Sequence, residues 1–204
     1  MAARIDHAVT SGTFSLDGET HQVDNNVWVV GDGSECVVID APHSVPEIVK
    51  LIDGRDVKAV LCTHGHDDHV RFAPMLGRVT QAPVLLHPAD QPLWQRTHAE
   101  QPDGQLGDGQ TITVGGLTIK VLHTPGHAPG AVCFYVPMLG TVFTGDTLFN
   151  GGPGATGRSF SDRDTLVASI RAKLFALPDD TVVKTGHGDD TTIGAEKQAL
   201  GAEG

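Results

Sequence analysis

A short run of the sequence brings together the side-chain types that bind first-row metal ions. Residues 63–69 read Thr-His-Gly-His-Asp-Asp-His, an HxHxDH pattern that begins where an apolar run ends. We expect His64 and His66 to turn toward one point from an extended loop. We expect Asp68 and His69, at the start of a helix, to face a second point nearby. Neutral imidazoles and carboxylates suit zinc and its neighbours, so the run predicts a metal site rather than a solvated polar loop.

Three later segments each place one ligand-type side chain beside a glycine and just past a predicted strand. These residues are His127 after 117–124, Asp146 after 140–144 and His187 after 181–184. Loops at one edge of a sheet stack are where sites are commonly built on a rigid scaffold. We therefore expect these three residues to join the HxHxDH residues. Asp67, which lies between ligands, is expected to be an exposed residue at a helix N-terminus.

The remaining histidines and one glycine-rich loop are interpreted more conservatively. His123 is predicted to be a core or strand-end residue, with a hydrogen bond to a metal ligand as the alternative. The histidines predicted to be structural or surface residues are His7, His21, His43, His87 and His98. The loop 152–159 departs from a phosphate-binding loop because Arg158 replaces the lysine and a helix does not follow directly. We expect a rigid loop beside the metal site, in which Arg158 either anchors a substrate carboxylate or pins the loop.

The elements that must position these residues follow from short β-branched runs bounded by Gly, Pro or Asp. Strands are predicted over 12–16, 26–30, 35–40, 57–63, 83–87, 110–114, 117–124, 131–136, 140–144 and 181–184. One helix is predicted after a capping box of Ser44 and Glu47, one after a weaker box of Ser161 and Asp164, and two over about 70–76 and 89–97. Hairpins, then strand-helix units, then further hairpins predict an α/β sandwich of sheets flanked by helices.

The composition of the chain limits the kinds of molecule that the protein is expected to bind. The chain has 204 residues, which we read as one domain over 1–204, and a formal net charge of -11. With no cluster of Lys and Arg, this charge disfavours nucleic acid. No apolar stretch is long enough to cross a membrane, and the first residues lack a signal-peptide core. Three scattered cysteines are typical of a cytoplasmic protein. The oligomeric state stays open.

Taken in order, the motifs HxHxDH, PGH at 125–127, GD at 145–146 and GH at 186–187 resemble the metallo-β-lactamase superfamily. The stretches TPGHAPGAVCF and GDTLFNGG resemble, more narrowly, its glyoxalase II (hydroxyacylglutathione hydrolase) branch. The resemblance implies an αββα four-layer sandwich and a dinuclear site. It also implies a ligand set in which one metal is held by His64, His66 and His127, the other by Asp68, His69 and His187, with Asp146 as the bridge.

Such a site would perform hydrolysis. Two metals about 3.5–4 Å apart can share a hydroxide, lower its pKa and polarise the carbonyl that it attacks. We therefore expect a hydrolase that uses a metal-bridging hydroxide to cleave a small-molecule acyl thioester or related acyl ester. Asp68 and Asp146 are its expected catalytic carboxylates. Zinc is the expected metal, and iron and manganese tolerate the same ligands.

Some features depart from the glyoxalase II branch. Those enzymes carry an additional helical C-terminal domain that grips glutathione, whereas this sequence ends at Gly204. The glycine-rich loop GGPGATGRSF also differs from the shorter GG-x-GR form. Both departures disfavour glutathione as the thiol. Because many true metallo-β-lactamases carry Cys or another residue in place of Asp146, antibiotic hydrolysis is disfavoured too.

Two enzyme alternatives and one non-enzyme alternative are carried forward. A mono-iron persulfide dioxygenase would share HxHxDH, PGH and GD, using two histidines and one carboxylate. The run 157–160 weakly resembles the GR-x-x-F of that branch. A lactonase of the same superfamily is disfavoured because the only tyrosine, Tyr135, lies inside a predicted strand. A non-catalytic binding protein is disfavoured because no expected ligand is lost.

Overall fold

The computed structural model describes residues 2–201, and the first half of the chain builds one six-stranded sheet. Its spatial order is β1 (Arg4–Leu16), β2 (Glu19–Gly31), β3 (Glu35–Ile39), β4 (Asp56–Leu61), β5 (Val84–Leu86) and β6 (Gly104–Gln105). The pairs β1/β2 and β2/β3 are antiparallel. The three pairs from β3 to β6 are parallel, so β3, β4 and β5 end at one edge.

The second half builds another six-stranded sheet. Its order is β14 (Thr191–Thr192), β13 (Val182–Thr185), β10 (Thr141–Gly145), β9 (Val132–Val136), β8 (Leu117–His123) and β7 (Thr111–Val114). Only the pair β10/β13 is parallel among the described strands of this sheet. A two-stranded ribbon, β11 (Leu148–Phe149) with β12 (Gly152–Pro153), follows β10.

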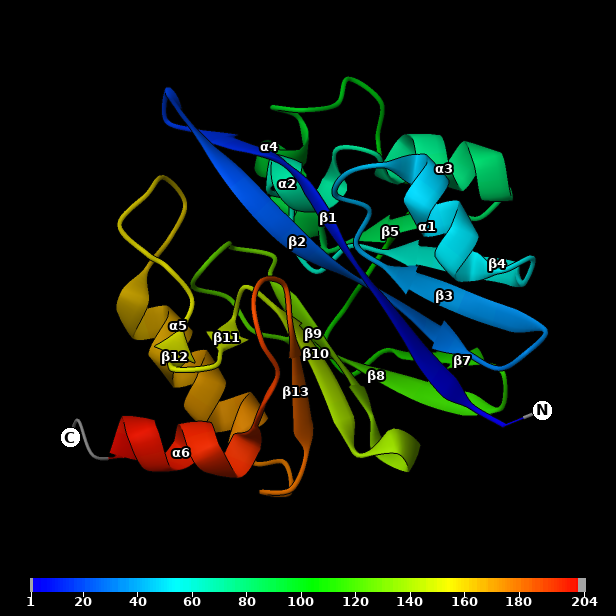
Figure 1. The fold of residues 1–204 in the computed structure, drawn as a ribbon. Coiled ribbons are helices and arrows are strands. Elements are labelled where there is room, and N and C mark those ends of the chain that lie inside the picture. The colour runs from blue at the N-terminus through cyan, green and yellow to red at the C-terminus, as the bar shows by residue number, and fades with distance from the viewer. Residues whose placement is uncertain (1, 202–204) are drawn as a thin grey trace.

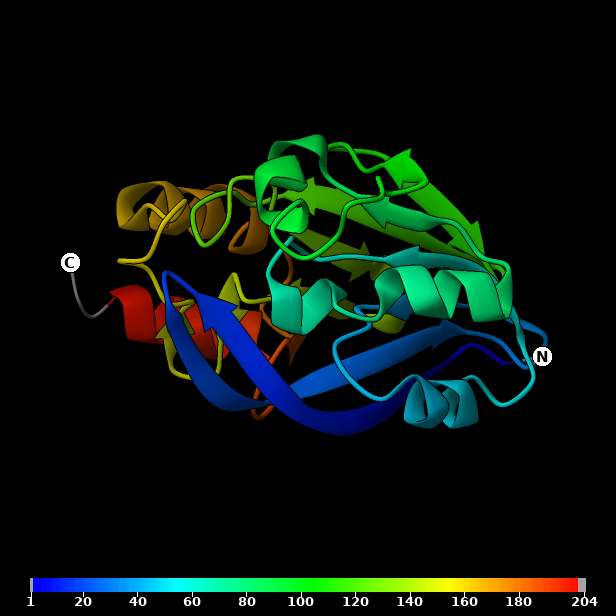
Figure 2. The same cartoon turned by 90° about the horizontal axis from the view of Figure 1, so that it is seen from above.

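Helices cover the outer faces of both sheets. On the first lie α1 (Val45–Ile52), α2 (Asp67–Val70), α3 (Ala73–Thr80), the 3₁₀ turn η1 (Pro88–Asp90) and α4 (Gln91–Trp94). The second carries α5 (Arg163–Ser169), its π-helical continuation η3 (Ile170–Leu174) and α6 (Ile193–Gly201), and the turn η2 (Pro137–Leu139) joins β9 to β10. Figure 1 shows α1 and α3 at one side of the molecule, α5 and α6 at the other, and both sheets between them. The view from above in Figure 2 agrees. The expected αββα sandwich is therefore confirmed.

The hydrophobic core falls into layers that match this architecture. In β2, Val27 and Val29 belong to the cluster beneath α1 and α3, whereas Trp28 and Val30 belong to the cluster between the two sheets. Successive side chains of a strand point to opposite faces, so a strand buried on both faces is apolar throughout. A third cluster joins the second sheet to α5, η3 and α6. The site is thus mounted on two sheets that are each packed on both sides.

Several local predictions need correction. Ser44 does precede α1, but it has left-handed backbone (φ 52) and its side chain makes no capping hydrogen bond. The N-cap of α5 is Asp162, which accepts from the Thr165 amide, rather than Ser161. The predicted helix at 70–76 is two short helices, α2 and α3. The strands predicted at 12–16 and 26–30 are parts of one long hairpin, β1 and β2, and α6 was not predicted.

The part of the chain that the structure describes, residues 2–201, contains no helix long and apolar enough to cross a membrane.

Candidate metal centre

The residues predicted as ligands lie together where strands of both sheets end. His64 and His66 follow β4, and Asp68 and His69 lie in α2 directly after them. The others follow strands of the second sheet: His127 follows β8, Asp146 follows β10 and His187 follows β13. Hydrogen bonds tie the two edges together, since Asn26 N donates to Gly186 O and Val132 N donates to Thr63 O. The sequence motifs therefore meet in one place.

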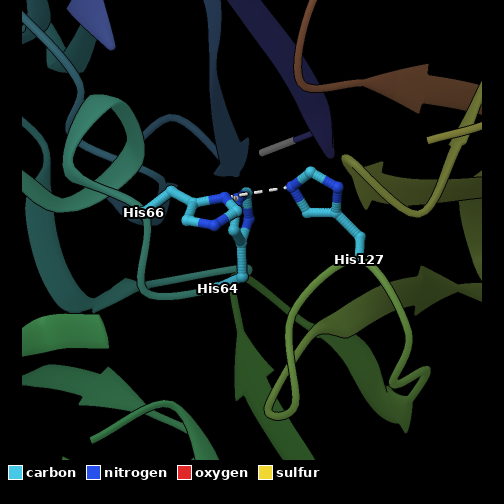
Figure 3. A group of neighbouring side chains, drawn as sticks. All are labelled: His64, His66 and His127. Atoms are coloured by element: carbon cyan, nitrogen blue, oxygen red, sulfur yellow. Dashed lines mark hydrogen bonds between the residues drawn. The ribbon is translucent and has the colours of Figure 1, made fainter. Parts of the chain in front are cut away.

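One group consists of the three buried histidines His64, His66 and His127 (Figure 3). His66 Nδ1 lies 2.9 Å from His64 Nε2 and 3.0 Å from His127 Nε2. Ligand nitrogens on one tetrahedral zinc ion stand roughly 3.3 Å apart, so the three rings are close to a shared coordination geometry. Burial, and next the neighbouring imidazoles, lower the pKa of His66 to about 3 and that of His64 well below its usual value. Both rings are therefore neutral and offer lone pairs.

A second group consists of Asp68, His69 and His187. His187 Nε2 lies 3.3 Å from His69 Nε2 and 3.4 Å from Asp68 Oδ2. Burial lowers the pKa of both imidazoles, but nearby carboxylates outweigh it, raising the pKa of His187 to about 10 and that of His69 well above its ordinary value. Burial raises the pKa of Asp68, but the attraction of the His69 charge and the hydrogen bonds from His187 and Asn25 outweigh burial and lower this pKa to about 2. The carboxylates and imidazoles of this group therefore attract one another.

Asp146 lies between the two groups. Its Oδ2 is 3.6 Å from His127 Nε2 and 3.5 Å from His187 Nε2, and its Oδ1 is 3.3 Å from His69 Nε2. Glycine at 186 makes room, since a Cβ there would lie 2.3 Å from Asp146 Oδ1. That oxygen is buried and, apart from the ion-pair contact with His69, has no hydrogen-bond donor within residues 2–201. A buried carboxylate oxygen with so few partners is costly unless something binds it, which is the environment of a metal ligand.

Most rings are oriented by a hydrogen bond on the nitrogen that faces away from the site. His127 donates its Nδ1–H to Ala155 O (2.8 Å), and His187 donates its Nδ1–H to Asp24 O (2.7 Å). His69 Nδ1 lies 2.8 Å from Asp40 Oδ2. Such bonds fix the tautomer and leave Nε2 free for a metal. The donor set, the convergence of nitrogens and the buried Asp146 oxygen all fit two first-row metal ions.

Sequence reasoning missed the residues that support these ligands. Asp40 also accepts from the amide and hydroxyl of Thr63 (2.7 and 2.8 Å). Asn25 donates to Asp68 Oδ2 (3.0 Å) and contacts the buried His43 (3.0 Å). Asp40 ends the predicted strand 35–40, and this position at a strand end is the one signal that could have indicated it. Asn25 and His43 carry no comparable signal.

Asp90 links the two loops of the three-histidine group. Its carboxylate is fully buried and accepts from the backbone N–H groups of Gly65 (2.7 Å) and Gly130 (2.5 Å). Burial raises the pKa of this carboxyl to about 6, although both hydrogen bonds oppose the shift. Gly65 separates two of the histidines, and Gly130 lies in the loop of the third, so one side chain sets the spacing between the loops.

Two other expectations concern residues near the ligands. Asp67 is partly buried rather than exposed, because it pairs with Arg71 and accepts from the Ser15 amide. His123 lies at the end of β8, stacked on His87 with ring centroids 4.1 Å apart, and its Nε2 donates to a backbone oxygen. It contacts none of the predicted ligands through these bonds, in agreement with a strand-end role.

A cavity of about 290 Å³ opens onto the ligands. Its other walls come from the β1–β2 hairpin and the glycine-rich loop, namely Phe14, His21, Val23, Ala155, Arg158, Ser159 and Ser161. The Arg158 guanidinium lies over the Phe14 ring (5.1 Å) with Nη2 3.2 Å from His21 Nε2. Ser159 N donates to Asp17 Oδ2 (2.9 Å), which joins hairpin and loop. Arg158 is therefore at the cavity wall, where the sequence placed a candidate substrate anchor.

Comparisons with known proteins agree with this geometry. Residues 22–187 match the model of the metallo-beta-lactamase superfamily. Hydroxyacylglutathione hydrolase GloC of Haemophilus influenzae is 34% identical over 85% of this chain and 88% of its own. The crystal structure of TTHA1623 in a di-iron-bound form is 33% identical, with a TM-score of 0.78 over 94% of this chain and 98% of that one. The crystal structure of BLEG-1 B3 metallo-beta-lactamase is 29% identical, with a TM-score of 0.80 over 93% and 97%.

The family model spans most of the chain, the similar solved structures share its fold, and the histidines and aspartates of this chain gather where strands of its two sheets end. This chain is a metallo-hydrolase of the metallo-beta-lactamase superfamily, with a candidate dinuclear metal site.

Proposed function

We propose that this protein uses two metal ions to hydrolyse a small-molecule acyl thioester or a related acyl ester. The observation that carries the proposal is that two complete ligand groups flank Asp146, which contacts members of both. His64, His66 and His127 would hold one ion, Asp68, His69 and His187 the other, and Asp146 would be shared. When bound, the two ions supply an activated water and an electrophile for the carbonyl oxygen.

The protein's own groups orient the reaction. Asp68 is held by Asn25 and faces the cavity, where its carboxylate accepts a hydrogen bond and orients the attacking water. Asp146 fixes the separation of the two ligand groups. A competing cysteine nucleophile is disfavoured, because all three thiols are buried and burial raises the pKa of Cys36 and Cys133 to about 11.

The cavity supports an acyl substrate that carries an anionic group. Arg158 lines the same cavity as the apolar side chains Phe14 and Val23, with its guanidinium over the Phe14 ring, and it can bind a carboxylate through two hydrogen bonds. We propose Arg158 as the residue that anchors this group. Similarity to a hydroxyacylglutathione hydrolase supports a thioester, although the carrier thiol is left to experiment.

Several further assignments belong to the proposal. We propose zinc as the native metal because a ligand set of imidazoles and carboxylates suits it, and a relative's di-iron form makes iron the first alternative. We propose that residues 1–204 are one domain and that the protein works in the cytoplasm, where its buried, unpaired cysteines stay reduced.

Metal analysis and substrate assays together test the proposal. Protein purified without added metal is expected to contain close to two metal ions per chain and to release thiol from a panel of 2-hydroxyacyl thioesters. His66→Ala and Asp146→Ala should abolish turnover while circular dichroism stays unchanged. A single iron per chain with oxygen consumption on a thiol persulfide would replace hydrolysis with the dioxygenase. Full activity in both variants would overturn the site.

A further inference from the structure

We propose that His43 and Asn25 form a buried hydrogen-bonded pair that positions Asp68 at the candidate metal site. His43 Nε2 lies 3.0 Å from Asn25 Oδ1, and Asn25 Nδ2 lies 3.0 Å from Asp68 Oδ2. All three side chains are buried, with exposed fractions of 4%, 0% and 3%. Water therefore does not compete for these bonds, and each is stronger than it would be at the surface.

The hydrogen-bonding capacity of each group fixes the direction of the pair. An ionised carboxylate only accepts, so Asn25 must turn its NH₂ toward Asp68 and its oxygen toward His43. His43 must then donate through a protonated Nε2. Burial lowers the pKa of His43 and so favours the neutral ring, and the Asn25 oxygen at Nε2 selects the tautomer with the proton on that nitrogen. Without the His43 donor, the Asn25 amide loses the partner that holds its orientation.

The backbone is shaped to admit the His43 ring. A Cβ added at Gly12 in β1 would lie 2.3 Å from His43 Nδ1 and 2.4 Å from its Cε1, so the ring packs directly on the strand. The segment that carries His43 is bent, with left-handed backbone at Asp40 (φ 61) and Ser44 (φ 52). Because such backbone is unfavourable for these residues, its presence indicates that the surrounding contacts enforce it.

The segment 40–43 supports the group of Asp68, His69 and His187 through the side chains at its two ends. Asp40 orients His69 through Nδ1, and His43 acts on Asp68 through Asn25. Asn25 Nδ2 also lies 3.4 Å from the Nε2 atoms of His69 and His187, so one amide faces every member of that group. The pair is accordingly expected to act on the Asp68 group and to leave the three-histidine group unaffected.

The chain offers a matched control. His7 Nε2 in β1 lies 2.8 Å from Asn26 Oδ1, and Asn26 directly follows Asn25 in β2. His7 and Asn26 therefore form a second histidine–asparagine pair next to the first. However, the Asn26 amide donates to the backbone oxygens of Thr185 and Gly188 rather than to a predicted ligand. His7→Leu removes the same kind of bond without touching Asp68.

The test is zinc titration of chelator-treated protein against a chromophoric chelator, with His187→Ala identifying the step that belongs to the Asp68 group. His43→Leu should weaken that step by about 10–100-fold, the usual effect of removing a partner of a metal ligand, and should lower kcat more than it changes KM. His43→Gln, which keeps a donor, should restore most of the loss. His7→Leu should titrate and turn over like the parent.

Coupling separates positioning from packing. In His43→Leu, Asn25→Leu and the double variant, the losses should not add, because both changes break one chain of bonds. The inference is overturned if His43→Leu binds both zinc equivalents like the parent, if His43→Gln is as impaired as His43→Leu, or if the losses add. If His43→Leu does not fold, His43→Gln and Asn25→Leu decide the matter. The inference rests on the proposed metal site, but the zinc titration that tests it needs no substrate. If the unmodified protein binds zinc and does not cleave thioesters, only the proposed reaction is overturned.

Discussion

At the residue scale, the candidate metal ligands were easier to predict from the sequence than the residues that hold them in place. The motif spacing places ligand-type residues at strand ends, and the structure brings every one of those residues together, while their role as ligands stays a prediction. Asn25 and His43 could not be identified because each is an ordinary polar residue until the fold sets it against a ligand, and only its position at a strand end could have indicated Asp40. Hydrogen bonds between residues more than a dozen positions apart leave no local pattern.

Asp40 provides a prediction about metal affinity. Asp40→Asn would replace the carboxylate oxygen that faces His69 Nδ1, so the ring would lose the partner that selects its tautomer. We expect zinc affinity of the Asp68 group to fall by about 10–100-fold. Competition titration of chelator-treated protein measures the effect. Asp56→Asn, which changes an exposed partner of Lys58, is the control, and equal affinities in the two variants would contradict the role of Asp40.

Arg158 provides a prediction about substrate binding. If its guanidinium anchors the anionic end of the substrate, Arg158→Ala should raise KM by about 10-fold or more and leave kcat within a few-fold, because the lost bond serves ground state and transition state alike. Steady-state kinetics on the best thioester of the panel measures both constants. Arg78→Ala removes a surface pair with Glu100 and should change neither. A fall in kcat alone would assign Arg158 to loop structure.

At the element scale, periodicity located most strands but misjudged their ends. The β1–β2 hairpin continues far beyond the predicted strands, because cross-strand pairing extends it through polar residues such as Ser11, Gln22 and Asp24. Helix α6 was missed because its apolar and polar residues do not separate onto opposite faces. Capping boxes failed where tertiary contacts determined the backbone, as at Ser44. Short helices are set by packing more than by local signals.

Asp90, which joins two loops, provides a pH prediction. Its pKa is about 6 in the fold against 3.8 for an ordinary aspartate, so its stabilising contribution is present below about pH 4 and is lost as pH rises through about 6. The difference corresponds to about 3 kcal/mol. The free energy of unfolding of the chelator-treated parent protein and of Asp90→Asn is measured with urea at about pH 4.5 and pH 8. The amount by which the parent is more stable than the variant should shrink as pH rises. An advantage that grows with pH would show that the two backbone donors outweigh burial.

At the scale of the whole molecule, the αββα architecture could be predicted because the resemblance covers most of the chain and the motifs occur in the expected order. The order of the predicted strands and helices alone gave an α/β sandwich of sheets flanked by helices, and the resemblance specified its four layers. The arrangement matters for chemistry because ligands from 64 to 187 come from both sheets, whose facing sides form the central core. Closing that core therefore assembles the site, and ligands bound there connect segments that are distant in sequence.

This coupling makes the metal a stabiliser of the whole fold. Ions that bind the native but not the unfolded chain add about 2.7 kcal/mol per site at a free concentration 100-fold above Kd. One kcal/mol shifts Tm by about 2–4 °C in a protein of this size, so removing each ion should lower Tm by about 5–10 °C. Calorimetry before and after chelation measures the shift, with metal analysis confirming removal. Asp146→Ala, which lacks the residue between both groups, should show a much smaller shift. The Tm of this variant is compared with and without chelator, so any destabilisation by the substitution itself cancels. If the Tm of the parent protein does not change after complete removal of metal, the ligand groups are held together by their own charges and not by metal.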